Sequence, residues 1–187
     1  MTARNQQAAM LEDVMRKTET LLAGVRPDQL GLPTPCSEWD VRQLQNHLVG
    51  WARHFAARES GQESSADPST YEVSGDASGE FADSTGTLIA ALDGKLSAPP
   101  EPPGEGAFPP TALTTMLIGE YVVHGWDLAT ATGQKVAFTD PEAEAALGLR
   151  SLLTPEYRGQ MFGAEVEPPA GASSLQQLVA FAGRQPA

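Results

Sequence analysis

Glu120 and His124 lie four residues apart in a segment that is otherwise rich in apolar side chains. On an α-helix this spacing stacks the two side chains on one face, one turn apart. The same stripe carries Leu113, Leu117, Leu128 and Ala131. Burying a carboxylate and an imidazole among apolar groups costs several kcal/mol unless something pairs with them. A metal ion would provide that pairing.

His47 is the candidate third ligand, on the edge of another apolar stripe. That stripe consists of Val41, Leu44, Leu48, Trp51 and Phe55. His54 follows on the same edge two helical turns later, roughly 10.5 Å along the axis, so the two histidines cannot easily bind one ion. His47 is nearer the centre of its segment and is therefore the preferred ligand.

Two imidazoles and one carboxylate are typical ligands of a zinc-like divalent ion, and three protein ligands leave a coordination position for water or substrate. That arrangement is characteristic of catalytic zinc, whereas structural zinc usually has four protein ligands. Nickel, iron and manganese accept the same ligand types. From spacing alone, the alternative is a buried Glu120–His124 hydrogen bond or a core histidine bonded to a neighbour.

Several other residues have both a chemical and an ordinary interpretation. Asp127 lies on the same side of its helix as His124 and could orient that ligand, or it could simply pair locally. Cys36 precedes a predicted helix N-terminus, where the dipole lowers a thiol pKa, but a small buried residue is the alternative. Tyr121 and Tyr157 are candidate proton donors.

Four arginines could hold a substrate carboxylate, with a solvated surface role as the default: Arg42, Arg53, Arg150 and Arg158. Trp39 is expected to pack against the connector before its helix. Trp51 and Trp126 are expected in the core or in a pocket wall.

Four long segments repeat apolar residues at offsets of three and four, which predicts amphipathic helices. They cover 11–25, a helix with its N-cap at Ser37, 81–96, and Thr111 to a C-terminal Gly133. An N-cap at Asp140 predicts a fifth helix towards Leu153, and Ser174 a short last one ending at Gly183. No segment alternates with period two. The predicted fold is all-α, a four-helix bundle with C-terminal additions, in a single domain over 1–187.

Two connectors separate these helices, and we expect them to determine the substrate. Residues 59–79 are rich in Ser, Gly, Asp and Glu and are predicted to form a mobile loop. Pro99–Pro110 is too rich in proline for a helix.

The formal net charge of −12 argues against nucleic-acid and anionic-membrane partners. The N-terminal residues lack the apolar region of a signal peptide, and no apolar run is long enough to span a membrane. Cys36 is the single cysteine, which excludes an internal disulfide and a thiolate-rich zinc site. These features suit a soluble cytoplasmic protein, and a bundle of this size can form a homodimer through an exposed apolar face.

Two helical motifs resemble a known family. The segment Thr34–Gly50 looks like the second helix of actinobacterial DinB-like proteins, and more closely like the metal-binding N-terminal domain of mycothiol-dependent maleylpyruvate isomerase. His124–Gly133 resembles that family's His-x-Trp-Asp-Leu-Ala segment. The tail, at Phe162–Val166 and Leu178–Arg184, is similar to a small, mostly uncharacterised branch of these proteins.

The resemblance implies a four-helix bundle with a divalent metal, usually zinc, at His47, Glu120 and His124. It also implies mycothiol as the thiol. The isomerase itself carries a further C-terminal domain, for which 187 residues leave little room. We therefore carry over the metal site and not the isomerase reaction.

Three hypotheses follow from the residues and the resemblance. In the first, the protein is a metalloenzyme in which the ion deprotonates a small-molecule thiol that attacks an electrophilic substrate. In the second, it is a metal-dependent hydrolase that uses bound water. In the third, it is a non-catalytic binding or stress-response module in which Glu120 and His124 form a buried polar pair.

Overall fold

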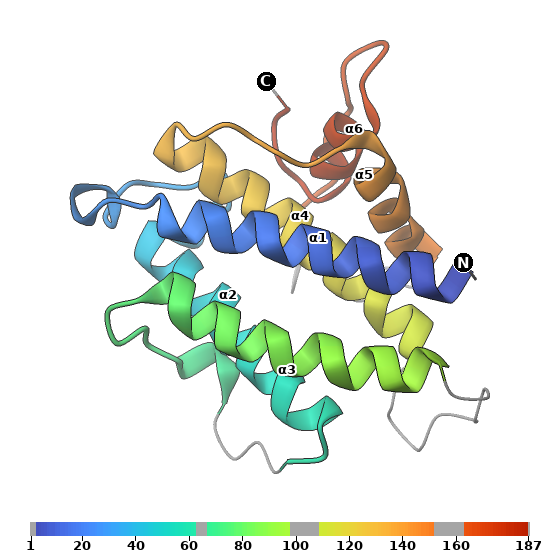
Figure 1. Cartoon of the computed structure of the whole chain (residues 1–187). Helices are drawn as coiled ribbons and strands as arrows, with labels where there is room; N and C mark the ends of the chain where they lie inside the picture. Colours follow the sequence, from blue (N-terminus) through green and yellow to red (C-terminus); the bar gives the residue numbers. More distant parts are fainter. Residues whose placement is uncertain (1–2, 63–66, 98–108, 152–162, 187) are drawn as a thin grey trace.

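The computed structural model describes residues 3–62, 67–97, 109–151 and 163–186, and the regular elements in these ranges are helices (Figure 1). The four long ones are α1 (Ala3–Ala23), α2 (Val41–Glu59), α3 (Ala77–Ser97) and α4 (Pro110–Thr132). Two short helices lie towards the C-terminus, α5 (Asp140–Leu147) and α6 (Ser174–Phe181). The all-α, DinB-like bundle with C-terminal additions is therefore confirmed.

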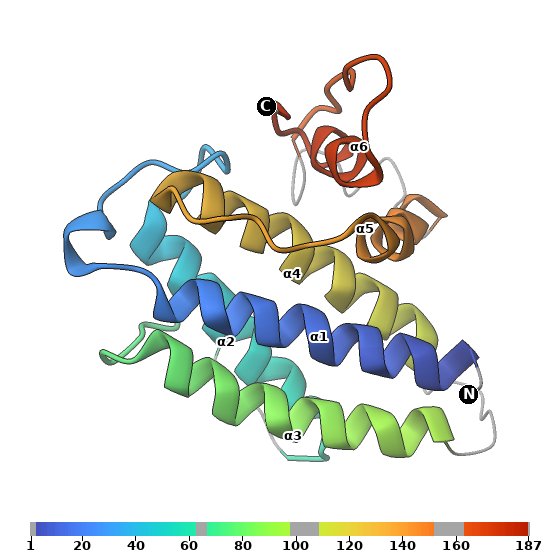
Figure 2. The ribbon, with the colours of Figure 1, turned by 45° about the horizontal axis from the view of Figure 1, so that its top comes forward.

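The long helices form a ring in the order α1, α3, α2, α4, because α1 and α2 each pack against both α3 and α4. Helices α5 and α6 pack on each other and cover the outer side of α4 (Figure 2). As a result α4 has neighbours on most of its circumference, and most of its residues are buried.

The predicted apolar stripes fill the interior of the bundle. Nine of their residues are 0% exposed: Leu11, Val14, Val41, Leu44, Leu48, Phe81, Leu88, Leu117 and Leu128. The period of 3.6 residues puts such side chains on one face of each helix, and burial of that face is what holds the helices together.

The start of α2 corrects one prediction, because its N-cap is Asp40 and not Ser37. The Asp40 carboxylate accepts a hydrogen bond from the Gln43 backbone N–H at 2.8 Å, and the Gln43 side chain accepts one from the Asp40 N–H at 2.9 Å. The preceding chain folds back on itself, since the Val41 N–H donates to the Leu32 carbonyl at 3.0 Å. Ser37 therefore lies in a turn before the helix.

Other helix boundaries are close to those predicted. Helix α4 ends at Gly133, whose φ of 69° is the left-handed conformation that a C-terminal glycine supplies. The N-caps of α5 and α6 are Thr139 and Ser173, each immediately before the predicted residue. Helix α5 ends at Leu147 and a 3-10 turn, Gly148–Ser151, follows, so the predicted continuation towards Leu153 is wrong over the described residues.

The segment predicted as a mobile loop, 59–79, is partly structured. It includes the end of α2, a 3-10 turn at Pro68–Thr70 and the start of α3. The Val73 N–H donates to the Asn46 side chain at 3.0 Å, which ties the segment to α2. At Gly50 an added Cβ would lie 2.4 Å from the Pro68 carbonyl oxygen, so the glycine permits this close packing.

Most of the second connector, residues 99–108, lies outside the described residues, and Pro110 belongs to α4. Within the described parts of the chain, none of the helices combines the length and the apolar character that crossing a bilayer requires.

Candidate metal centre

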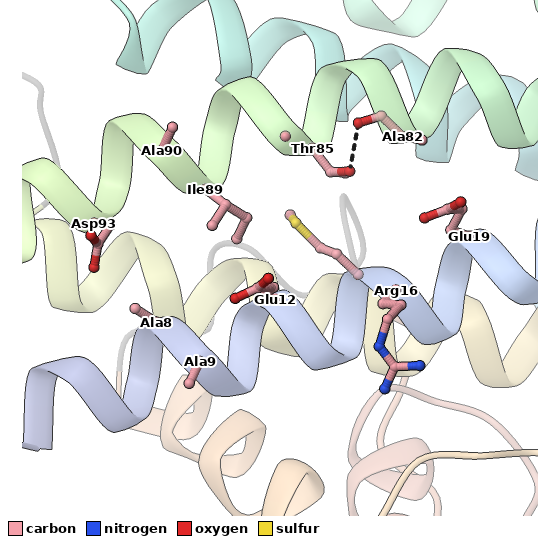
Figure 3. Close-up of a pocket in the computed structure, with 12 residues that line it drawn as sticks. Ala8, Ala9, Glu12, Arg16, Glu19, Ala82, Thr85, Ile89, Ala90 and Asp93 are labelled. Atoms are coloured by element: carbon pink, nitrogen blue, oxygen red, sulfur yellow. Dashed lines mark hydrogen bonds between the residues drawn. The ribbon is translucent and has the colours of Figure 1, made fainter. Parts of the chain in front are cut away.

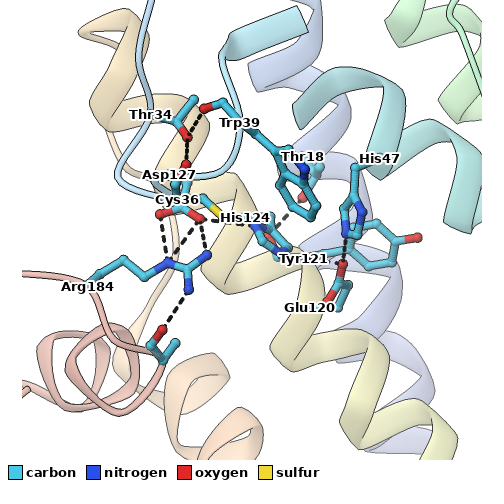
Figure 4. Close-up of polar contacts among 11 residues, drawn as sticks. Thr18, Thr34, Cys36, Trp39, His47, Glu120, Tyr121, His124, Asp127 and Arg184 are labelled. Carbon is cyan, nitrogen blue, oxygen red and sulfur yellow. Dashed lines mark hydrogen bonds and ion pairs between the residues drawn. The ribbon is translucent and has the colours of Figure 1, made fainter. Parts of the chain in front are cut away.

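His47 on α2 faces Glu120 and His124 on α4 (Figure 4). His47 Nε2 lies 2.6 Å from Glu120 Oε1, and His124 Nε2 lies 3.6 Å from the same oxygen. One ligand atom from each residue lies within 4.8 Å of the other two. In the described part of the chain, this is the one group of three or more His, Cys, Asp or Glu side chains that converges in this way.

The cluster lies at the edge of the interior, where α2 and α4 approach each other. The side chains of His47, Glu120 and His124 are 17%, 22% and 10% exposed. His54 is not part of the cluster and packs against Trp51 instead, with ring centroids 5.4 Å apart. The choice of His47 over His54 therefore agrees with the geometry.

Glu120 is an ionised carboxylate in this setting. Burial by itself would raise its pKa, but the charges of His124 and His47, the hydrogen bond from His47 and the charge of Arg184 outweigh burial. Together they lower the pKa of Glu120 to about 2. An ionised carboxylate flanked by two imidazoles is ready to bind a cation without first losing a proton.

Asp127 contacts the far side of the His124 ring, with its Oδ2 3.1 Å from His124 Nδ1. Burial would raise the pKa of Asp127, but hydrogen bonds from His124 and Arg184 lower it. An ionised carboxylate can only accept hydrogen bonds, so Nδ1 of His124 donates to Asp127, and Nε2 is the ring nitrogen that faces Glu120 and can bind a metal. This contact has the geometry of the orienting role that the sequence left open for Asp127, beside the alternative of a local pair.

Trp39 is part of the site, which the sequence did not indicate. Its ring centroid lies 4.2 Å from that of His47 and 5.3 Å from that of His124. The Thr34 hydroxyl donates to the Trp39 carbonyl at 2.7 Å and so fixes the turn that carries the indole. Trp39 therefore covers both imidazoles from the connector before α2, and is not simply packed against that connector.

The donor set fits a divalent metal. Ligand atoms around four-coordinate zinc lie ~3.3 Å apart, given bonds of about 2.0–2.1 Å. The 3.6 Å between His124 Nε2 and Glu120 Oε1 is close to that value. The 2.6 Å between His47 and Glu120 is a hydrogen bond, so His47 Nε2 must release its proton before it can act as a ligand.

Comparison with known proteins identifies the family of this chain. The model of the mycothiol maleylpyruvate isomerase N-terminal domain family matches residues 11–129, which is more than half of the sequence. The chain belongs to this family. Two uncharacterised proteins of Mycobacterium tuberculosis, from strains CDC 1551 / Oshkosh and ATCC 25618 / H37Rv, are each 36% identical to it over 168 residues. The match covers 88% of this chain and 90% of each relative. No solved structure gives a significant match.

The segment of this chain that the family model matches, residues 11–129, includes His47, Glu120 and His124, together with Asp127. Arg184 lies beyond that segment and was not among the arginines considered from the sequence. It reaches the site through Asp127, with Arg184 Nη2 2.8 Å from Asp127 Oδ2. Nothing in local spacing signals a contact between residues so far apart in the chain.

Of the four arginines considered from the sequence, the three that the structure describes have other contacts. Arg53 stacks on the Tyr71 ring, Arg150 pairs with Glu165, and Arg42 lines a separate cavity of about 250 Å³ beside α1. Arg158 lies outside the described residues.

Cys36 and Tyr121 do not have the properties that their chemical interpretations require. Burial raises the pKa of Cys36 despite nearby Arg184, and α2 begins at Val41 rather than beside the thiol. Tyr121 is fully buried, and among the described residues its hydroxyl has no hydrogen-bond partner. Burial and the charge of Glu120 raise its pKa, which disfavours loss of a proton. Tyr157 lies outside the described residues.

A larger cavity lies elsewhere, as a groove of about 640 Å³ between α1 and α3 (Figure 3). Small side chains form much of its floor, and four charged residues line it: Glu12, Arg16, Glu19 and Asp93. None of the three metal-ligand candidates lines this groove.

Proposed function

We propose that the protein is a divalent-metal-dependent enzyme that uses a small-molecule thiol of the mycothiol type, in a transferase or isomerase-like reaction. The observation that carries the proposal is the convergence of His47, Glu120 and His124 in a chain of this family. Zinc suits the ligand set best and nickel is the alternative. The family's description supports mycothiol as the thiol.

The ion would lower the pKa of a bound thiol and would polarise a carbonyl oxygen of the substrate. The chain's own residues prepare this chemistry. Glu120 supplies a negative charge at neutral pH, and Asp127, by its contact with Nδ1, would hold His124 with Nε2 available to the ion. The Trp39 indole lies against both imidazoles and limits the access of water to them.

Metal content tests the first part of the proposal. We expect purified wild-type protein to hold close to one divalent ion per chain by mass spectrometry, and His124→Ala to hold almost none. His54→Ala is the matched control, because His54 lies on α2 outside the cluster and should leave the metal content unchanged. Equal, low metal content in wild type and His124→Ala would contradict the proposal.

The reaction type needs a separate assay. In the transferase form, metal-loaded protein should consume mycothiol in the presence of an electrophile: the thiol sulfur bonds to carbon, the bond from that carbon to its leaving group breaks, the leaving group keeps the electron pair, and the thiol proton passes to solvent. In the isomerase-like form, the thiol adds to a carbon–carbon double bond and is then eliminated, so the substrate isomerises only when thiol is present and the thiol is returned. Hydrolysis of ester or amide substrates without thiol consumption would instead establish the metal-dependent hydrolase.

The non-catalytic module makes a third, distinct prediction. That module was expected to pair Glu120 with His124, but these two lie 3.6 Å apart, and the hydrogen bond in the structure joins His47 to Glu120 at 2.6 Å. In such a module, chelator would leave the melting temperature unchanged. Under our proposal, chelator lowers the melting temperature of wild type and has no effect on His124→Ala, because ligand binding to the folded state stabilises it.

A further inference from the structure

We propose that Arg184, which lies beyond the segment matched by the family, is a positioning residue of the metal centre. It holds Asp127 in the orientation that directs His124, so the end of the chain is part of the site. The inference rests on the proposed metal function.

The contact between Arg184 and Asp127 is extensive. Arg184 Nε lies 3.2 Å from both carboxylate oxygens of Asp127, and Nη2 lies 2.8 Å from Oδ2 (Figure 4). The side chain of Asp127 is 0% exposed and that of Arg184 is 6% exposed. A guanidinium that donates in this way fixes the plane of a carboxylate, which a single point charge does not do.

The same carboxylate oxygen meets both partners. Asp127 Oδ2 accepts from Arg184 and also lies 3.1 Å from His124 Nδ1. A change in the plane of the carboxylate would therefore change the direction in which the His124 ring is held. Because the His124 tautomer depends on the hydrogen bond at Nδ1, Arg184 acts on the metal-binding nitrogen through Asp127.

Arg184 is itself held by the end of α6. Its Nη1 donates to the Ala182 carbonyl at 2.6 Å, and the preceding residue, Gly183, has a φ of 85°. A Cβ on Gly183 would lie 2.9 Å from the Gly163 Cα, so the backbone at Gly183 packs closely against the backbone at Gly163. The position of the guanidinium is therefore set by the fold of the C-terminal segment.

Arg184→Gln is the decisive variant, with zinc affinity measured by competition against a chelator. We expect affinity to fall roughly tenfold to a hundredfold, the usual effect of losing a group that orients a metal ligand. Arg150→Gln is the matched control: Arg150 contacts Glu165 and the Phe181 ring of the same C-terminal segment without contacting Asp127. It should leave affinity within about twofold of wild type, since it does not touch the ligand's partner.

A purely structural role for Arg184 predicts a different result. Arg184→Gln would then lower the melting temperature but would bind zinc as tightly as wild type does, and our inference would be wrong. If Arg184→Gln does not fold, Arg184→Lys replaces it, because lysine keeps the positive charge but lacks the planar guanidinium that donates through two nitrogens. Weakened zinc binding by folded Arg184→Lys would support the inference, and wild-type affinity would overturn it.

A second readout is independent of metal. The chain has three histidines, so nitrogen-15 spectra of the side chains can be assigned by His47→Ala and His54→Ala. In metal-free wild type, at a pH where the imidazole is neutral, His124 should carry its proton on Nδ1, and Arg184→Gln should disturb this preference. If Arg184→Gln changes the His124 tautomer but wild type binds no metal, the positioning role of Arg184 is supported and the proposed function is wrong. An unchanged His124 tautomer in Arg184→Gln would overturn the positioning role.

Discussion

The metal-centre candidate and the α1–α3 groove differ in what they contain. The groove has the larger open volume, about 640 Å³, but its charged side chains lie at the surface, where Arg16 pairs with Asp13. The candidate centre instead gathers His, Glu, Asp and Arg side chains that are mostly buried. Burying such groups costs free energy unless they pair, so their convergence is a stronger indication of function than open volume.

The largest expected contrast comes from the same substitution in each region. Glu120→Gln removes the ionised ligand, and we expect zinc affinity to fall at least about a hundredfold, because a neutral amide is a poor ligand for a divalent ion. Glu12→Gln removes a carboxylate that lines the groove and should leave affinity unchanged. Isothermal titration calorimetry with zinc measures the affinity of both variants. Equal losses in the two variants would mean that the comparison between the regions is wrong.

Two glycine substitutions compare packing beside the site with packing in the groove. In Gly125→Ala the new Cβ would lie 2.5 Å and 2.7 Å from atoms of the Phe138 ring, and we expect a loss of about 1–3 kcal/mol in the free energy of unfolding. Gly86 lines the groove with no atom near the position of a Cβ, so Gly86→Ala should stabilise the metal-free protein by up to about 1 kcal/mol through helix propensity. Urea denaturation measures both. Similar changes would show that the surroundings of Gly125 adapt as freely as those of Gly86.

The pH dependence of stability should distinguish the regions by a smaller effect. The folded-state pKa of Glu120 is about 2, below its ordinary value of 4.5. The resulting stabilisation is fully present above pH ~4.5 and is lost as the pH falls towards ~2, because the unfolded state takes up its proton first. Metal-free Glu120→Gln should therefore lose less unfolding free energy than wild type over this range. Glu12→Gln should keep the wild-type slope, and a wild-type slope in Glu120→Gln would contradict the assigned environment.

The smallest effect is expected from the ion pair beside the groove. Arg16 and Asp13 are 66% and 40% exposed, and exposed pairs contribute at most about 1 kcal/mol. Arg16→Gln should change the free energy of unfolding by less than that and leave zinc affinity unchanged. A larger loss of stability, or any loss of zinc binding, would mean that the groove is coupled to the metal-centre candidate.

The helices and the shared face of Glu120 and His124 followed from local patterns. Periodicity located the buried faces of α1 to α4, and the four-residue spacing of Glu120 and His124 placed both side chains on one face of α4. Capping was harder to predict, because Ser37 and Asp40 both begin acceptable capping patterns. The hydrogen bond from the Val41 N–H to the Leu32 carbonyl favours Asp40 as the N-cap, and no local sequence pattern indicates this hydrogen bond.

Two contributors to the site were missed for the same physical reason. Trp39 reaches His47 and His124 because the turn before α2 folds back, and Arg184 reaches Asp127 because α5 and α6 return the chain to α4. Both contacts depend on the path of irregular segments. The available signal was an arginine directly after a predicted helix C-terminal glycine, Gly183-Arg184, although this pattern does not indicate a partner for the arginine.

Anomalous scattering at the zinc edge, from crystals of protein purified with zinc, tests the metal site most directly. We predict one strong peak within bonding distance of His47 Nε2, a Glu120 carboxylate oxygen and His124 Nε2, with Asp127 still on His124 Nδ1. A zinc-replete crystal with no peak at these three residues, or with its strongest peak elsewhere, would contradict the proposal.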